Sequence, residues 1–102
     1  MSKMQRDKGA RIEREIVALF QSWGLKALRV PLSGATTYAK GDVDVYLANR
    51  DAPLIAEVKS RKDGFKQLTS WLGEFDMLVV RPNNGPPMFV LPTETMRELM
   101  TR

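Results

Sequence analysis

The sequence predicts an α/β fold in which a small mixed β-sheet is flanked by helices, in the order α-β-β-β-α-β-β-α. Two observations predict it. Stretches at the beginning, middle and end of the chain repeat apolar residues at helical spacing, and short apolar runs bounded by turn residues lie between them. With 102 residues, the chain is expected to form one domain over residues 1–102.

The first half of the chain predicts one helix and three strands. A helix is expected from about residue 9 to residue 23, with Gly24 as its C-cap, because apolar residues recur there at three- and four-residue steps. Three short apolar segments follow and are expected to be strands, over residues 25–30, 43–48 and 54–59. A polar loop over 33–40 and a turn over 49–52 connect them.

The second half predicts a helix, a hairpin and a last helix. Residues 63–74 carry an apolar stripe at helical spacing. The runs 77–80 and 88–91 flank a segment rich in Pro, Asn and Gly, which is typical of a hairpin turn. Thr93 is the expected N-cap of the final helix.

Composition excludes several kinds of chemistry. The chain has no cysteine and no histidine, so disulfides, thiolate metal sites, Ser-His-Asp triads and the usual zinc sites are ruled out. What remains is catalysis by carboxylates, lysine, hydroxyls or a hard metal ion held by oxygen ligands.

The net charge of +4 is concentrated in two segments. Residues 3–14 carry five basic side chains, and residues 59–66 carry four. Such patches favour a polyanionic partner, most simply nucleic acid, although a solvated basic surface is the alternative.

The chain begins without an apolar signal segment, and its apolar runs are too short to span a bilayer. A cytoplasmic protein without a membrane partner is therefore expected.

Two aspartates, Asp42 and Asp44, lie at the start of the strand predicted at 43–48. Asp is disfavoured in strands, so their presence needs a reason. If the hairpin turns symmetrically near residues 50 and 51, Asp44 lies opposite Glu57, and Asp42 lies opposite Lys59. Three carboxylates would then share one face beside a lysine, and they would repel one another unless a cation such as Mg²⁺ bound there. The alternative is that the aspartates cap the entry of the strand or lie on a hydrated strand edge.

Glu13 is expected within the apolar arc of the first helix, whereas Glu15 points away from it. A glutamate in a buried stripe needs a partner. Two interpretations stay open: a helix-edge glutamate paired with Lys or Arg, or a carboxylate directed into a functional site.

Four segments resemble known motifs. Lys8-Gly9, three residues and then Glu13-Arg14-Glu15 resemble the opening of archaeal-type Holliday junction resolvases, and residues 29–34 resemble their Arg-x-Pro-x-Ser-Gly segment. Asp42 and Glu57-Val58-Lys59 are similar to the PD-(D/E)XK signature of restriction-endonuclease-like nucleases. The resemblance covers roughly residues 6–80, and the segment from Asp63 to Arg81 looks like small phage and bacterial forms. Gly41 replaces the motif proline, and the chain is shorter than typical resolvases.

The resemblance implies a site and its chemistry. Asp42 or Asp44 and Glu57 would bind Mg²⁺, or Mn²⁺ in its place, with the Val58 carbonyl as a further ligand and Glu13 completing the site. Asp42 fits the motif and Asp44 fits the expected register, so both stay candidates. Lys59 would orient water or stabilise the transition state. DNA phosphates would be contacted by basic and hydroxyl side chains: Arg6, Lys8, Arg11, Arg29, Ser33, Lys40, Arg61, Lys62 and Lys66.

The resemblance therefore implies a Mg²⁺-dependent endonuclease, most specifically a resolvase of branched, four-way DNA junctions that acts as a homodimer in recombination and repair. A related nuclease for flaps, nicks or duplex ends is one alternative. A non-catalytic DNA-binding module with the same fold is another.

Overall fold

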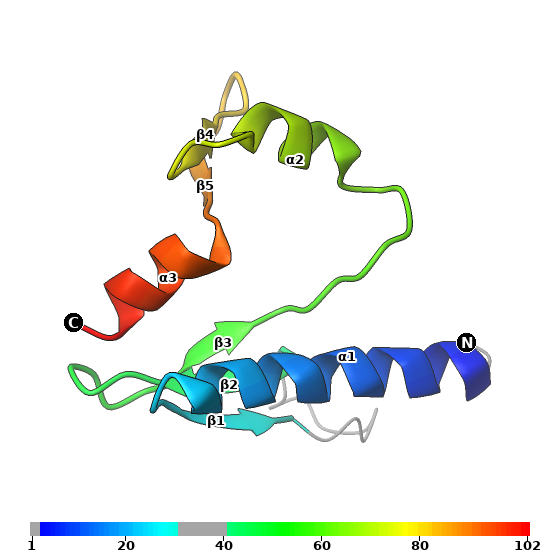
Figure 1. Ribbon diagram of the computed structural model, residues 1–102, viewed down its shortest axis with the longest axis vertical. Helices are drawn as coiled ribbons and strands as arrows, with labels where there is room; N and C mark the ends of the chain where they lie inside the picture. Colours follow the sequence, from blue (N-terminus) through cyan, green and yellow to red (C-terminus); the bar gives the residue numbers. More distant parts are fainter. Residues whose placement is uncertain (1–2, 31–40) are drawn as a thin grey trace. The chain divides into compact units, whose positions relative to one another are not determined.

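The computed structural model describes residues 3–30 and 41–102, apart from the side chains of residues 4–7, so the loop expected over 33–40 lies outside the described residues. The described chain divides into two compact units, Met1–Ser60 and Arg61–Arg102. The expectation of one domain stays a prediction. The helices and strands of the described residues follow one another in this order (Figure 1): α1 (Lys3–Ser22), β1 (Lys26–Arg29), β2 (Val43–Tyr46), β3 (Leu54–Ala56), α2 (Lys66–Leu72), β4 (Leu78–Val80), β5 (Met88–Val90) and α3 (Thr93–Met100).

The α/β class and the order of elements are confirmed. The described strands pair antiparallel throughout, as a sheet in the order β1-β2-β3 and a separate β4-β5 pair, in place of the one mixed sheet expected. None of the helices within the described ranges has the length and apolar character needed to cross a membrane.

Helix α1 begins six residues before its predicted start. The added turns consist of Lys, Met, Gln and Arg with one Asp, most of them good helix formers that give no apolar periodicity to detect. Its end is as predicted. Gly24 has a φ of 85°, its N–H donates to the Gln21 carbonyl, and the N–H of Leu25 donates to the Phe20 carbonyl. This pair of bonds is a Schellman motif, which satisfies the last carbonyls of the helix.

Helix α1 lies along the three-stranded sheet and covers one of its faces (Figure 1). Ala27 pairs with Val45, and Arg29 pairs with Val43, so these four residues share a face. Ala27, Val43 and Val45 are the buried apolar residues in the described part of the chain, and Val43 is 0% exposed. The neighbouring positions face the other way, and Leu28 and Ile55 remain exposed there.

The register of the β2–β3 hairpin differs from the prediction by two residues. Asp44 pairs with Ile55, and Val43 pairs with Ala56, so Asp44 does not lie opposite Glu57 and Asp42 does not lie opposite Lys59. The hairpin turns earlier than expected, because the N–H of Arg50 donates to the Leu47 carbonyl. Strand β3 also ends at Ala56, so the segment from Glu57 to Lys59 follows the strand.

In the second unit, α2 is shorter than the helix expected over 63–74, and Gly73 follows it with a positive φ of 49°. The β4–β5 hairpin forms as expected. Thr93 is the first residue of α3 and not its N-cap; Pro92 occupies that position, and its fixed ring supplies the extended entry to the helix without a side-chain bond.

Candidate active site

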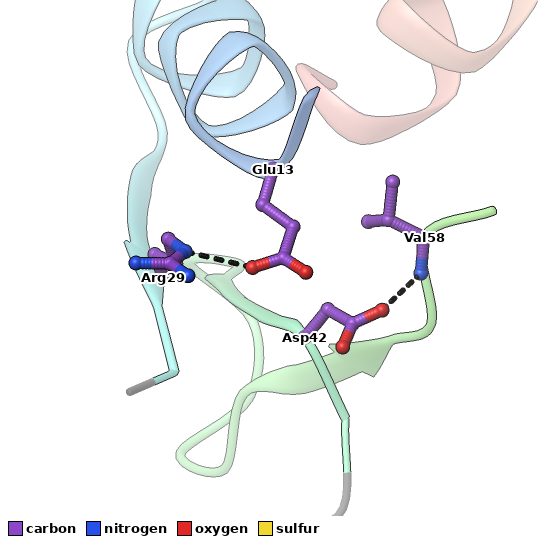
Figure 2. A network of polar contacts seen from close by, with 4 residues as sticks. All are labelled: Glu13, Arg29, Asp42 and Val58. Carbon is purple, nitrogen blue, oxygen red and sulfur yellow. Dashed lines mark hydrogen bonds and ion pairs between the residues drawn. The ribbon is translucent and has the colours of Figure 1, made fainter. Parts of the chain in front are cut away.

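Asp42 is fixed from both neighbouring strands. Its N–H donates to the Ala56 carbonyl at 2.9 Å, and its own carbonyl accepts the N–H of Val30 at 2.9 Å. Its side chain accepts the N–H of Val58 at Oδ2, at 2.8 Å (Figure 2). Because the main-chain bonds hold the residue and the Val58 bond holds its carboxylate, Asp42 presents its oxygens in a defined place at the end of β3.

Glu57 is exposed, and its carboxyl group lies next to that of Asp42. A hydrogen bond to Asp42 raises the pKa of Glu57 above its ordinary value of 4.5, and the charge of Asp42 and some desolvation raise this pKa further. Lys59 acts in the opposite direction, and Glu13 adds a smaller repulsion. Two carboxyl groups brought together in this way favour either a shared proton or a bound cation.

Glu13 combines the two interpretations that the sequence left open. Its residue is only 7% exposed, which makes it the buried charged residue of the described chain. The Nε atom of Arg29 donates to Glu13 Oε1 at 2.7 Å, so the glutamate has the ion-pair partner of the first interpretation. Figure 2 shows its carboxylate directed from α1 toward the region of Asp42, in keeping with the second.

Arg29, for which a contact with DNA phosphates stays a prediction, forms an ion pair with Glu13 in the structure. A Lys or Arg partner for Glu13 was one of the two interpretations left open, but the sequence did not identify that partner as Arg29. A signal for it was present: Arg29 alternates with Ala27 on a short strand, so it lies on the same buried face, where a charged residue requires an opposite charge.

Asp44 is separated from the carboxyl pair by the register of the sheet. It lies between Leu28 and Ile55 on neighbouring strands, whereas Asp42 takes the place beside Glu57. The geometry therefore favours Asp42 over Asp44 as the partner of Glu57. Lys59 is exposed, and its positive charge acts to lower the pKa of Glu57.

The oxygen atoms available at this site are of the chemical type that binds a hard divalent cation. Within residues 3–30 and 41–102, no group of three or more acidic, His or Cys side chains is arranged to hold a metal. What the fold assembles is a pair, Asp42 and Glu57, whose mutual repulsion a cation would relieve. Carboxylate and carbonyl oxygens are the ligands that Mg²⁺ prefers, and the main chain of Val58 lies directly beside them.

The predicted phosphate contacts are spread over both units. Lys8 and Arg11 are exposed on α1 of the first unit. Arg61, Lys62 and Lys66 are exposed in the second, where Lys66 pairs with Asp63 at 3.1 Å. Ser33 and Lys40 lie outside the described residues, as does the side chain of Arg6.

Comparison with known proteins identifies a family. A family model described as archaeal Holliday junction resolvase (Hjc) matches residues 4–70, which is about two thirds of the chain. That range contains the Glu13–Arg29 pair and the segment from Asp42 to Lys59. No curated protein matches the chain. No solved structure matches it either.

Proposed function

The chain belongs to the archaeal Holliday junction resolvase family of nucleases, and we propose that it hydrolyses phosphodiester bonds at DNA four-way junctions with the help of Mg²⁺. The observation that carries the proposal is the carboxyl pair of Asp42 and Glu57 within the matched residues. A partly buried aspartate next to an exposed glutamate, beside a lysine and a second, buried glutamate, is suited to phosphate chemistry assisted by a divalent ion.

Asp42, Glu57 and the main-chain carbonyl of Val58 would hold the metal, with Glu13 nearby. When bound, Mg²⁺ supplies charge neutralisation at the scissile phosphate and activates water. Mn²⁺, with similar oxygen preference, would serve in its place.

The protein's own residues have separate tasks. The Val58 N–H orients the Asp42 carboxylate by its 2.8 Å hydrogen bond. The Lys59 ammonium group, close enough to act on Glu57, stabilises the negative charge that grows on the phosphate oxygens. The Arg29 guanidinium group compensates the negative charge of the buried Glu13 and holds its side chain in place. Exposed cations such as Lys8 and Arg11 bind the DNA backbone, which makes the affinity dependent on salt.

A homodimer suits this reaction, because resolving a junction requires two symmetric cuts. The second unit offers apolar side chains that a subunit interface would cover, among them Phe75, which is 72% exposed, and Phe89. Light scattering of the purified protein should give about twice the chain mass of 11.6 kDa. A monomer at all concentrations, with and without DNA, would contradict the dimer.

The decisive test of the function is a cleavage assay on four substrates: a four-way junction, a flap, a nicked duplex and a linear duplex. The protein is first treated with EDTA to remove bound metal ions. It is then incubated with each substrate, with and without added Mg²⁺. We expect cleavage of the junction only with the metal. Preferred cleavage of flaps or nicks would favour the related structure-specific nuclease, and binding without any cleavage would favour the DNA-binding module.

Metal binding is tested separately from cleavage. Calorimetric titration with Mn²⁺ should show binding to the wild-type protein that Glu57→Gln abolishes. Glu98→Gln, an exposed change on α3, is the matched control and should leave binding unchanged. Equal binding by wild type and Glu57→Gln would place the metal elsewhere or exclude it.

A further inference from the structure

Gly41 lies directly before Asp42, where the chain passes close to β3. A Cβ atom built on Gly41 would lie 2.5 Å from Cγ2 of Ile55 and 3.0 Å from the carbonyl oxygen of Ala56. Carbon atoms in favourable contact are about 3.5–4.0 Å apart, so a side chain fits here only if its surroundings shift. The requirement is steric and not conformational, because the glycines with positive φ in the described residues are Gly24 and Gly73.

The atoms that crowd Gly41 belong to the same segment that positions the carboxyl pair. The Ala56 carbonyl accepts the N–H of Asp42, and Glu57 and Val58 follow it directly along the chain. Displacing this carbonyl would therefore move the acceptor that fixes Asp42 and the residue that carries the second carboxyl group.

Ile55 transmits the same constraint. Its Cγ2 methyl group is attached to a branched Cβ, which restricts χ1, and its backbone is held opposite Asp44 in the hairpin. The methyl group can move away from residue 41 only if Ile55 changes rotamer or β3 separates from β2. Ile55 is exposed, so truncation of this side chain leaves the buried face of the sheet intact.

We propose that Gly41 is a positioning residue: the absence of a side chain there lets β3 approach closely enough to set the spacing of the Asp42 and Glu57 carboxyl groups. In this chain, the glycine that stands in place of the motif proline is required by Ile55. The inference rests on the proposed role of the carboxyl pair in cleavage.

The test compares Gly41→Ala with two double variants. Gly41→Ala should lower single-turnover cleavage of a four-way junction by up to about 100-fold, since a displacement of about 1 Å at a site can have that effect. Adding Ile55→Ala removes the 2.5 Å conflict and should restore most of the activity, because the remaining 3.0 Å contact requires a shift of only a few tenths of an ångström. Ile55→Val keeps the branched methyl group and should restore nothing.

Amide hydrogen exchange gives a second readout that needs no activity. The N–H groups of Asp42 and Val58 donate the hydrogen bonds that join Asp42 to the segment from Ala56 to Val58, so Gly41→Ala should accelerate their exchange, and Ile55→Ala in the double variant should reverse this. Thermal unfolding followed by circular dichroism verifies that each variant is folded. Ile55→Ala alone should behave like the wild type in both measurements.

The two ideas fail in different ways. If the wild type cleaves and Gly41→Ala matches it in cleavage and exchange, the inference is overturned while the proposed function stands. If Ile55→Ala and Ile55→Val restore activity equally, the role of the Ile55 methyl group is wrong. If the wild type does not cleave any substrate, the proposed function fails, and the exchange data still decide whether Gly41 sets the geometry.

Discussion

Three apolar side chains and one charged side chain are buried among the described residues of the first compact unit, whereas no residue of the second unit, Arg61–Arg102, is buried. The first unit has a three-stranded sheet covered by a long helix, and the second has a two-stranded hairpin and two short helices. A polar cluster needs a packed framework to hold its geometry. The difference explains why the candidate site lies where it does.

The ion pairs show the same contrast. The side chains of Arg29 and Glu13 are 29% and 9% exposed, whereas those of Arg97 and Glu94 in the second unit are 43% and 74% exposed. An opposite charge is a structural requirement for the first glutamate and an optional contact for the second. The Arg29–Glu13 pair lies beside the candidate site, whereas the Arg97–Glu94 pair lies on the surface of α3.

The largest expected effect is a loss of cleavage that distinguishes an aspartate of the first unit from one of the second. Asp42→Asn should reduce junction cleavage by at least about 1,000-fold, because several kcal/mol of transition-state stabilisation depend on metal ligands and each ~1.4 kcal/mol is a factor of ten. Asp76→Asn in the second unit should cleave almost normally. Asp44→Asn should lose less than Asp42→Asn; a reversed order would mean that the register does not identify the metal ligand.

The second largest effect is expected for Lys59→Ala, which should lower the cleavage rate by about 100- to 1,000-fold. Removal of one preorganised group that stabilises transition-state charge typically has an effect of this size. Junction affinity should stay within a few-fold of wild type, measured by fluorescence anisotropy in Ca²⁺, because the group acts in the transition state. A variant that cleaves at a near wild-type rate would remove Lys59 from the mechanism.

Glu13→Gln should fold, bind junction DNA and lose at least about 100-fold in cleavage, since its charge belongs to the site. The amide oxygen still accepts a hydrogen bond from Arg29, so the unfolding free energy should change by no more than ~1 kcal/mol. Glu15→Gln, exposed on the same helix, is the control. Equal activity of the two variants would assign Glu13 a purely structural role.

The ion pairs themselves are compared through stability. Arg29→Met leaves the Glu13 carboxylate buried and uncompensated, which should cost about 2 kcal/mol of unfolding free energy, below the 3–5 of a fully buried pair because Arg29 is partly exposed. Arg97→Met should cost at most ~1 kcal/mol. Urea unfolding at pH 7 measures both, and equal losses would remove the distinction between the two regions.

The smallest effect concerns pH. Because the pKa of Glu57 is raised, the folded protein binds more protons than the unfolded chain at pH values between 4.5 and the raised pKa. Stability in EDTA should therefore fall as pH rises through that window, and Glu57→Gln should abolish this part of the fall. Added Mg²⁺ should counteract it in the wild type. An unchanged pH profile in Glu57→Gln would contradict the proximity of the two carboxyl groups.

Local sequence signals predicted the elements better than their pairing. The C-cap at Gly24 and the β4–β5 hairpin follow from glycine and turn chemistry that act over a few residues. The register of β2 on β3 did not, because a symmetric turn at residues 50 and 51 and the observed turn closed by Arg50 and Leu47 suit nearly the same residues. A difference of one residue in the turn centre changes the pairing by two.

The sequence by itself determined the chemical repertoire and the family. With neither histidine nor cysteine, the site chemistry was limited to carboxylates, lysine, hydroxyls and a metal ion held by oxygen ligands, and the motif residues lie inside the range matched by the family model. These conclusions depend on residue identity and spacing, which do not require knowledge of long-range packing.

Only the tertiary structure decided which residues meet. It placed Asp42, and not Asp44, beside Glu57, and it gave the buried Glu13 its partner in Arg29, sixteen residues away. It also brought β3 against Gly41 closely enough to exclude a side chain. Each outcome depends on strand register and on the contact of α1 with the sheet, and such long-range contacts are set by the packing of the whole unit and not by local preference.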